Sequence, residues 1–222
     1  MLPLILPVIV MAAWAVADPM LPADSTVPDL ARLVAGQDWK VENRSVQAVD
    51  KDGKKAVAFD ARPNDGLAWL SGFSFGNGEI ECDILGRSQP IQGSFVGIAF
   101  RVQDAKTFDA VYFRPFNFRA PDQERKAHSV QYVSHPDWTW NRLRNERTGQ
   151  YEKAIDPAPD GDQWIHARIV IRRPKVEVYV NGATTPSLVV DELSPRTDGS
   201  VGFFVGNGSP GAFANLKITA QK

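Results

Sequence analysis

The stretch Gly93–Trp140 decides the fold that we expect: GSFVGIAFRVQDAKTFDAVYFRPFNFRAPDQERKAHSVQYVSHPDWTW. In Phe95–Val102, large apolar residues alternate with small or polar ones, which is the period-two pattern of a strand with two different faces. The next run, Val111–Arg114, alternates in the same way. After a polar excursion, Ser129–His135 has the pattern of a third strand and leads into a tryptophan-rich segment. The stretch therefore predicts three strands of one sheet.

The alternation also predicts which side chains face the core. Residues that pair across antiparallel strands share a face, so Val111 and Phe113 are expected to lie over the core with the large apolar residues of the preceding strand. Tyr112 and Arg114 then lie on the other face, beside a glycine and an alanine of that strand. Small residues next to large polar ones leave space, so we expect a groove on this face.

Outside this stretch, short strand-like runs recur between turn signals such as DKDG at Asp50–Gly53. The chain has about eleven to thirteen such runs, the spacing of two stacked antiparallel sheets. A long loop over residues 134–163 interrupts the rhythm, and within it Trp138–Arg147 is predicted to form a short helix. We therefore predict an all-β, two-sheet antiparallel sandwich with a short helix in a long loop, formed by residues 36–222 as a single domain.

The N-terminal residues predict export. Residues 1–17 are uncharged, almost wholly apolar, and end in the small-x-small pattern Ala15-Val16-Ala17, so we interpret them as a signal peptide followed by a leader segment, residues 18–35. The alternative is an uncleaved anchor, but the run is short for a bilayer span of about 20 residues. We expect a periplasmic or extracellular protein that has no membrane segment after cleavage.

Composition excludes several other functions. The chain has 25 basic and 26 acidic residues, which are scattered, so nucleic-acid binding is not expected. Cys82 is the only cysteine, and its place in a predicted strand favours a buried structural thiol. His128, His135 and His166 have no metal-ligand spacing, so we expect neither a metal nor a cofactor.

A series of segments identifies a family resemblance. GEIECDIL at Gly78–Leu85, the strands of the Gly93–Trp140 stretch, WIHARIVIRRPKVEVYVNG from Trp164, GSVGFFVGNG from Gly199 and FANLKI from Phe213 resemble the concanavalin A-like lectin/glucanase superfamily. The resemblance is strongest to secreted bacterial 3-keto-disaccharide hydrolase-type domains. It implies a jelly-roll sandwich whose concave sheet holds a carbohydrate.

The predicted groove has the chemistry that such a ligand requires. Sugars present apolar C–H faces and hydroxyl groups, so their sites combine flat aromatic surfaces with planar donors and acceptors. The predicted ligand-binding residues are Arg101, Tyr112, Arg114, Gln131, His135, Trp138 and Trp140. The alternative is that the two tryptophans pack the long loop onto the sandwich and that Arg114 forms an internal ion pair.

Two sets of residues are candidates for catalysis. Glu79, Glu81 and Asp83 alternate along one strand, as the carboxylates of laminarinase-type glucanases do, but their order differs and they equally fit an outward polar face. His135 or Glu146 could serve as a single base for a substrate with an unusually acidic proton, such as one beside a ketone.

The sequence therefore predicts a saccharide-binding domain first. The proposed groove is rich in arginine and aromatic residues and poor in carboxylates, whereas glycosidases need a carboxylate pair about 5–10 Å apart. A glycoside hydrolase acting on a keto-disaccharide or glucan is the alternative, and a non-catalytic adhesion or scaffold domain is a third possibility.

Overall fold

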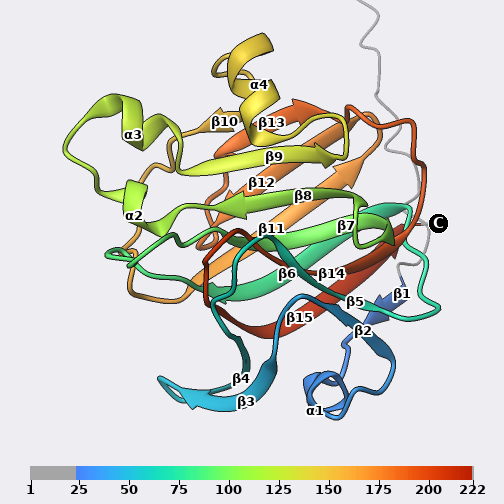
Figure 1. Cartoon of the computed structure of the whole chain (residues 1–222). Helices are drawn as coiled ribbons and strands as arrows, with labels where there is room; N and C mark the ends of the chain where they lie inside the picture. Colours follow the sequence, from blue (N-terminus) through green and yellow to red (C-terminus); the bar gives the residue numbers. More distant parts are fainter. Residues whose placement is uncertain (1–23, 222) are drawn as a thin grey trace, which may run out of the picture.

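The computed structural model describes residues 24–221, which form two antiparallel β-sheets stacked face to face (Figure 1). The eight-stranded sheet runs in the order β13 (Leu188–Asp191), β12 (Lys175–Val180), β11 (Ile165–Arg172), β6 (Asn77–Leu85), β15 (Gly211–Gln221), β4 (Lys54–Phe59) and β3 (Val46–Lys51), with β1 (Asp24–Thr26) beside β15. The seven-stranded sheet runs in the order β10 (Glu152–Lys153), β9 (Val130–His135), β8 (Thr107–Phe113), β7 (Val96–Asp104), β14 (Ser200–Val205), β5 (Gly66–Leu70) and β2 (Trp39–Glu42). The predicted all-β sandwich is confirmed.

The seven-stranded sheet has one face on the core and one face away from the other sheet, as the alternation predicts. Val111 pairs with Ile98 and with Tyr132, and all three side chains are buried between the sheets. One residue along, Tyr112 pairs with Gly97 and with Gln131, so these positions lie on the outer face.

Aromatic rings fill the middle of the sandwich. Phe203 of β14 stacks on Trp39 with ring centroids 5.4 Å apart and on Phe213 of the opposite sheet at 4.5 Å. Phe59 meets Phe213 edge-on at 5.3 Å. These contacts join both sheets and fix the inner face of β14, which leaves the neighbouring Phe204 on the outer face.

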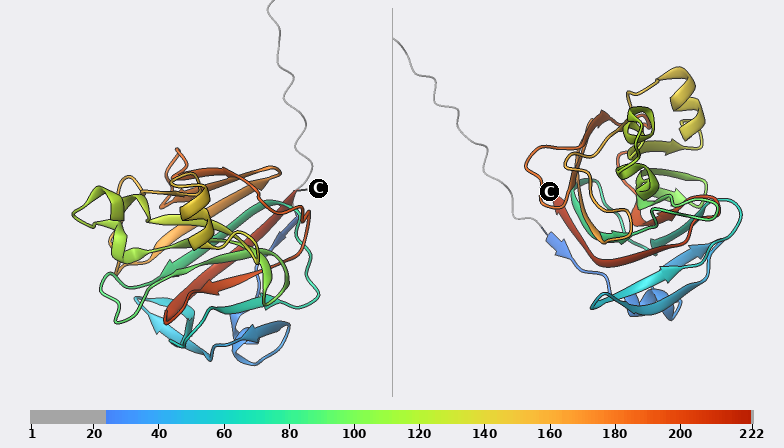
Figure 2. Two further views of the ribbon diagram at one scale, coloured as in Figure 1. Left: turned by 45° about the horizontal axis from the view of Figure 1, so that its top comes forward. Right: turned by 90° about the vertical axis from the view of Figure 1, so that its left-hand side faces the viewer.

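Four short helices accompany the sheets: α1 (Leu30–Val34), α2 (Pro115–Phe118), α3 (Gln123–Ala127) and α4 (Trp140–Glu146). Figures 1 and 2 show α2, α3 and α4 gathered on one side of the molecule, with α1 at the opposite side. Helix α4 is the predicted helix of the long loop, and it begins after Thr139, whose hydroxyl accepts a hydrogen bond from the Arg142 amide. No helix among residues 24–221 has the length and apolar character needed to cross a membrane.

The N-terminal boundary differs from the expectation. The predicted signal peptide, residues 1–17, and the first part of the leader lie outside the described residues. The described part of the leader joins the sandwich, since Asp24 pairs with Ala220 at the edge of the eight-stranded sheet and Leu33 of α1 is buried in the core. The domain therefore includes residues before position 36.

Candidate functional site

A pocket of about 540 Å³ lies on the outer face of the seven-stranded sheet. Its floor is formed by outward side chains of three strands, Tyr112, Val133 and Phe204. Gly97 lies between Tyr112 and Phe204 in the sheet, and a Cβ there would come within 2.1 Å of the Val111 carbonyl oxygen. The glycine therefore lets the strands approach, and no side chain of β7 fills the space between the two rings.

The floor of the pocket is aromatic. Tyr112 lies 5.6 Å from Phe204 and 6.1 Å from Phe95, measured between ring centroids. Phe116 of α2 packs edge-on against Phe95 at 5.6 Å. Trp140, the first residue of α4, is 49% exposed and lines the pocket from the side of the long loop. The pocket thus offers several ring faces and edges to a ligand.

A buried hydrogen-bonded network supports the Tyr112 ring of this floor. It joins Arg114, Tyr112 and Gln131. Arg114 donates to the Tyr112 hydroxyl at 2.7 Å and to Gln131, and the Tyr112 hydroxyl donates to Gln131 Oε1 at 2.7 Å. Arg114 also donates to the His128 carbonyl at 2.9 Å. Burial raises the pKa of Tyr112 to about 12, so the hydroxyl keeps the proton that it donates. The network fixes the side chains of Tyr112 and Arg114, which line the pocket, whereas Gln131 does not line it.

Basic residues mark one end of the pocket, which we call the cationic end: the arginines Arg114, Arg125 and Arg144, with His128 beside them. A single buried carboxylate, Glu152, lies behind them. Its Oε2 atom is 2.8 Å from His128 Nδ1, 3.1 Å from Arg144 Nη2 and 3.4 Å from Arg114 Nη1. Arg114 thus forms the internal ion pair considered as its alternative role.

The other end of the pocket, which we call the acid–base end, carries Asp65 and His135. His128 precedes β9 and His135 ends it, so the two ends lie about 20 Å apart along the strand. The His135 ring stacks on Phe108 with centroids 4.7 Å apart. Burial lowers the pKa of His135, more than the nearby charge of Asp65 raises it. Asp65 is exposed, yet the pocket walls desolvate its carboxyl group and raise its pKa.

The remaining predicted residues of the long loop lie outside the pocket. Trp138 is stacked by two arginines, Arg142 at 4.1 Å and Arg147 at 5.4 Å from its ring centroid. Glu146 is exposed and pairs with Arg142 at 3.0 Å. Neither Trp138 nor Glu146 lines the pocket, so of the two candidate bases only His135 lies there.

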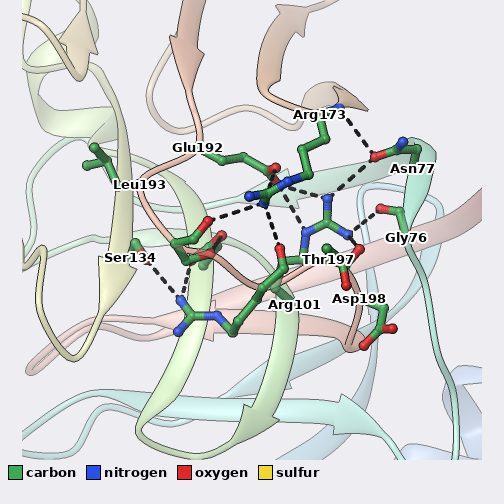
Figure 3. A network of polar contacts seen from close by, with 12 residues as sticks. Gly76, Asn77, Arg101, Ser134, Arg173, Glu192, Leu193, Thr197 and Asp198 are labelled. Carbon is green, nitrogen blue, oxygen red and sulfur yellow. Dashed lines mark hydrogen bonds and ion pairs between the residues drawn. The ribbon is translucent and has the colours of Figure 1, made fainter.

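Arg101 is a correction to the sequence-based prediction. Its side chain is fully buried and pairs with Glu192 at 2.9 Å, while it also donates to the carbonyls of Gly76 and Thr197 (Figure 3). The cause is a bulge: the register between β7 and β8 shifts after Phe100, and Arg101 adopts a positive φ of 54°. The bulge breaks the alternation, so Arg101 turns into an internal network instead of the groove.

The three carboxylates of β6 face away from the pocket, on the outer face of the eight-stranded sheet. Each has cationic partners: Glu79 lies 3.4 Å from Arg168, Glu81 2.7 Å from Lys217, and Asp83 2.8 Å from Lys54. The glucanase-like interpretation is therefore not supported. Cys82, between them, is fully buried, and within residues 24–221 no group of three His, Cys, Asp or Glu side chains could hold a metal ion.

Several pocket residues were not identified from the sequence. Phe95 and Phe204 follow the same period-two rule as Tyr112, so their strand patterns contained that information. Asp65 comes from a loop and Arg125 from a helix that we did not predict. Only the folded chain brings them to the same face.

Comparisons with known proteins agree with this architecture. A family model described as a 3-keto-alpha-glucoside-1,2-lyase-like domain matches residues 33–219, which confirms the resemblance identified from the sequence. The carbohydrate-binding module CBM66 from Bacillus subtilis is 14% identical with a TM-score of 0.59 and covers 82% of this chain and 95% of its own. A putative glycosyl hydrolase from Parabacteroides distasonis is 17% identical with a TM-score of 0.51 and covers 83% and 89%.

A third solved structure, the VIP36 exoplasmic/lumenal domain bound to Ca²⁺ and Man3GlcNAc, is 13% identical with a TM-score of 0.55 and covers 84% of this chain and 85% of that one. At these identities the likeness to solved structures shows the fold alone. The search of curated proteins gives no match.

Proposed function

We infer a function from the premise that this chain belongs to the 3-keto-alpha-glucoside-1,2-lyase-like domain family. We propose that it binds a saccharide in the pocket on the outer face of the seven-stranded sheet. The observation that carries this proposal is an aromatic floor bordered by fixed polar groups. Tyr112, Phe204 and Trp140 offer rings to the C–H faces of a sugar, and Asn117 and Asn207 offer amides to its hydroxyl groups.

Two of the structures with this fold are described as a carbohydrate-binding module and as a domain bound to Man3GlcNAc. We extend saccharide binding from those proteins to this chain because its pocket has suitable chemistry. A volume of about 540 Å³ lies within the range of ordinary ligand pockets.

Replacing Trp140 with alanine is expected to weaken saccharide binding about fivefold or more, which is about 1 kcal/mol. The ring is half exposed and lines the pocket, so its removal takes away stacking surface without opening the core. Isothermal titration calorimetry measures the affinity, and the melting temperature should stay within about 2 °C of the wild type.

Trp138→Ala is the matched control, because Trp138 lies two residues away and outside the pocket. It should keep the affinity even if it lowers the melting temperature. An unchanged affinity in Trp140→Ala would show that the Trp140 ring of α4 does not contact the saccharide.

A second candidate function is catalysis on a keto-sugar, and the state of His135 favours it. Because burial lowers its pKa, His135 is a neutral base at pH 7. A C–H proton beside a ketone is far more acidic than the other C–H protons of a sugar, so it is the proton that such a base would remove. Among the described residues that line the pocket, Asp65 is the one carboxylate, so they do not supply the carboxylate pair of ordinary glycosidases. If this chain is an enzyme, we propose His135 as the group that takes the proton.

We also propose that the chain is exported. Expression with the native N-terminus should yield a mature protein that begins near Asp18, since residues 1–17 have the pattern of a signal peptide. N-terminal sequencing or intact mass measures this, and a retained Met1 would indicate an anchor instead.

A further inference from the structure

The cationic end of the pocket has more positive charge than the protein neutralises. Three arginines line the pocket, whereas Asp65 is the one carboxylate among the described residues that line it, and the buried Glu152 lies behind the cationic end. Asp65 lies at the acid–base end, so it does not pair with the arginines. With His128 and His135 counted as neutral, the three arginines exceed the carboxylates Asp65 and Glu152 by one positive charge, although the whole chain has a net charge of −1.

The three arginines differ in how many hydrogen-bond and ion-pair partners their guanidinium groups have within the protein. Arg114 is buried, and its guanidinium contacts Tyr112, Gln131, Glu152 and the His128 carbonyl. It is a structural part of the wall. Both of its Nη atoms already donate hydrogen bonds within the protein, and its charge is paired with Glu152, so it does not account for the surplus charge.

Arg125 and Arg144 retain free hydrogen-bonding capacity. Within residues 24–221, the Arg125 guanidinium has no carboxylate partner and donates only to the Phe116 carbonyl at 3.2 Å and the Asn117 amide oxygen at 3.4 Å, while the backbone N–H of Arg125 donates to the N-capping Asp122 carboxylate. Arg144 shares Glu152 with Arg114 and His128, and its side chain is 35% exposed, so part of its guanidinium faces the pocket. Its guanidinium lies over the exposed Trp140 ring at 5.3 Å. Two guanidinium groups therefore line the same end of the pocket with capacity to bind an anion.

We propose that the saccharide bound in this pocket carries an anionic group, a carboxylate or a sulfate ester, and that Arg125 and Arg144 bind that group. This inference rests on the proposed function and specifies the class of its ligand. A planar guanidinium can form two parallel charge-assisted hydrogen bonds to a carboxylate or a sulfate, which a neutral hydroxyl cannot match. The aromatic floor then holds the sugar ring, and the arginines fix its orientation.

The test compares neutral sugars with sugars that carry an anionic group at C6. Methyl glucuronide carries a carboxylate at C6 where methyl glucoside carries a hydroxymethyl group. Glucose 6-sulfate carries a sulfate ester at the same carbon. The galacto-configured equivalents of these sugars test whether the preference depends on the stereochemistry of the ring. By isothermal titration calorimetry with the full mature chain at low salt, the anionic sugars should bind at least about tenfold more tightly than the neutral ones. The preference should shrink as salt is raised, because exposed charges are screened.

Variants locate the preference. Arg125→Gln should remove most of it while leaving the melting temperature unchanged, because Arg125 is exposed and has no ion pair among the described residues. Lys126→Gln is the matched control: it removes one positive charge from the next position of α3, outside the pocket, and should retain the preference.

The outcomes separate this inference from the function on which it rests. Equal affinity for anionic and neutral sugars would overturn the inference and leave saccharide binding in place. Absence of binding by every probe would overturn both. A preference for anions that survives both Arg125→Gln and Arg144→Gln would overturn the assigned residues. A preference for either the glucuronide or the sulfate, lost in Arg125→Gln, supports the inference and identifies the anion.

Discussion

Replacing Arg101 with alanine is expected to lower the free energy of unfolding by about 3–5 kcal/mol, the loss typical of breaking a buried ion pair by removing one partner. The Arg101 side chain is fully buried, and the side chain of its partner Glu192 is 1% exposed. The substitution would leave the Glu192 carboxylate with Arg173 as its remaining cation, 3.2 Å away. It would also take a donor from the carbonyls of Gly76 and Thr197. Urea denaturation with a constant m value measures the loss.

Arg173→Ala is the control for this prediction. Arg173 binds the same carboxylate, but its side chain is 35% exposed, so water can replace it. Its removal should cost about 1 kcal/mol or less. Equal, small losses in the two variants would show that burial of Arg101 contributes little.

The loss in Arg101→Ala should also depend on pH. Burial raises the pKa of Glu192, and the charges of Arg101 and Arg173 oppose that rise. Without Arg101 the rise is larger, so in the variant the folded state binds a proton on Glu192 at a higher pH than in the wild type and Glu192 no longer remains a buried anion. The difference in unfolding free energy between variant and wild type should therefore shrink from pH 7 to about pH 5.

Arg101 also shows where sequence reasoning fails in this fold. Strict alternation placed it in the groove, and the same rule correctly placed Val111, Tyr112 and Gln131. A bulge inverts the alternation at a single point, and a non-glycine residue with positive φ gives no warning in the sequence. Glu192, its partner, lies 91 residues further along the chain. Patterns of near neighbours cannot predict a pairing over that separation.

The pocket was predictable only in part, for a related physical reason. Strand periodicity predicts the residues of its floor, because the face of each strand follows from parity. The walls come from segments without periodicity. Asp65 lies in a loop before β5, and Arg125 lies in the short helix α3 within the excursion between β8 and β9. Trp138 and Trp140 are two residues apart, and the start of α4 decides that only the second lines the pocket.

Replacing His135 with glutamine is expected to lower the turnover of a 3-keto-glucoside by about 100-fold or more, the usual contribution of a general base. Glutamine keeps hydrogen-bonding capacity but cannot take a proton. Asp65, Asp109 and Arg196 are the charged groups near the His135 ring, and burial has the largest effect, so the pKa of His135 lies below its usual 6.5. Wild-type turnover should therefore be constant from pH 8 through pH 6.5 and fall only below it. A steady-state assay across this pH range measures both effects.

The same shift predicts a change in stability that does not depend on turnover. A histidine with a lowered pKa in the folded state is protonated first in the unfolded state, so acidification through about pH 6.5 favours unfolding. Acidification through about pH 6.5 should therefore lower the free energy of unfolding of the wild type through protonation of His135, and His135→Gln should not show this contribution. His166→Gln is the control for both measurements, because His166 lies on the outer face of the other sheet with its Nδ1 2.8 Å from Asp83. Turnover by His135→Gln within about twofold of the wild type would exclude His135 as the base. Absence of turnover in the wild type would leave saccharide binding as the function of the pocket.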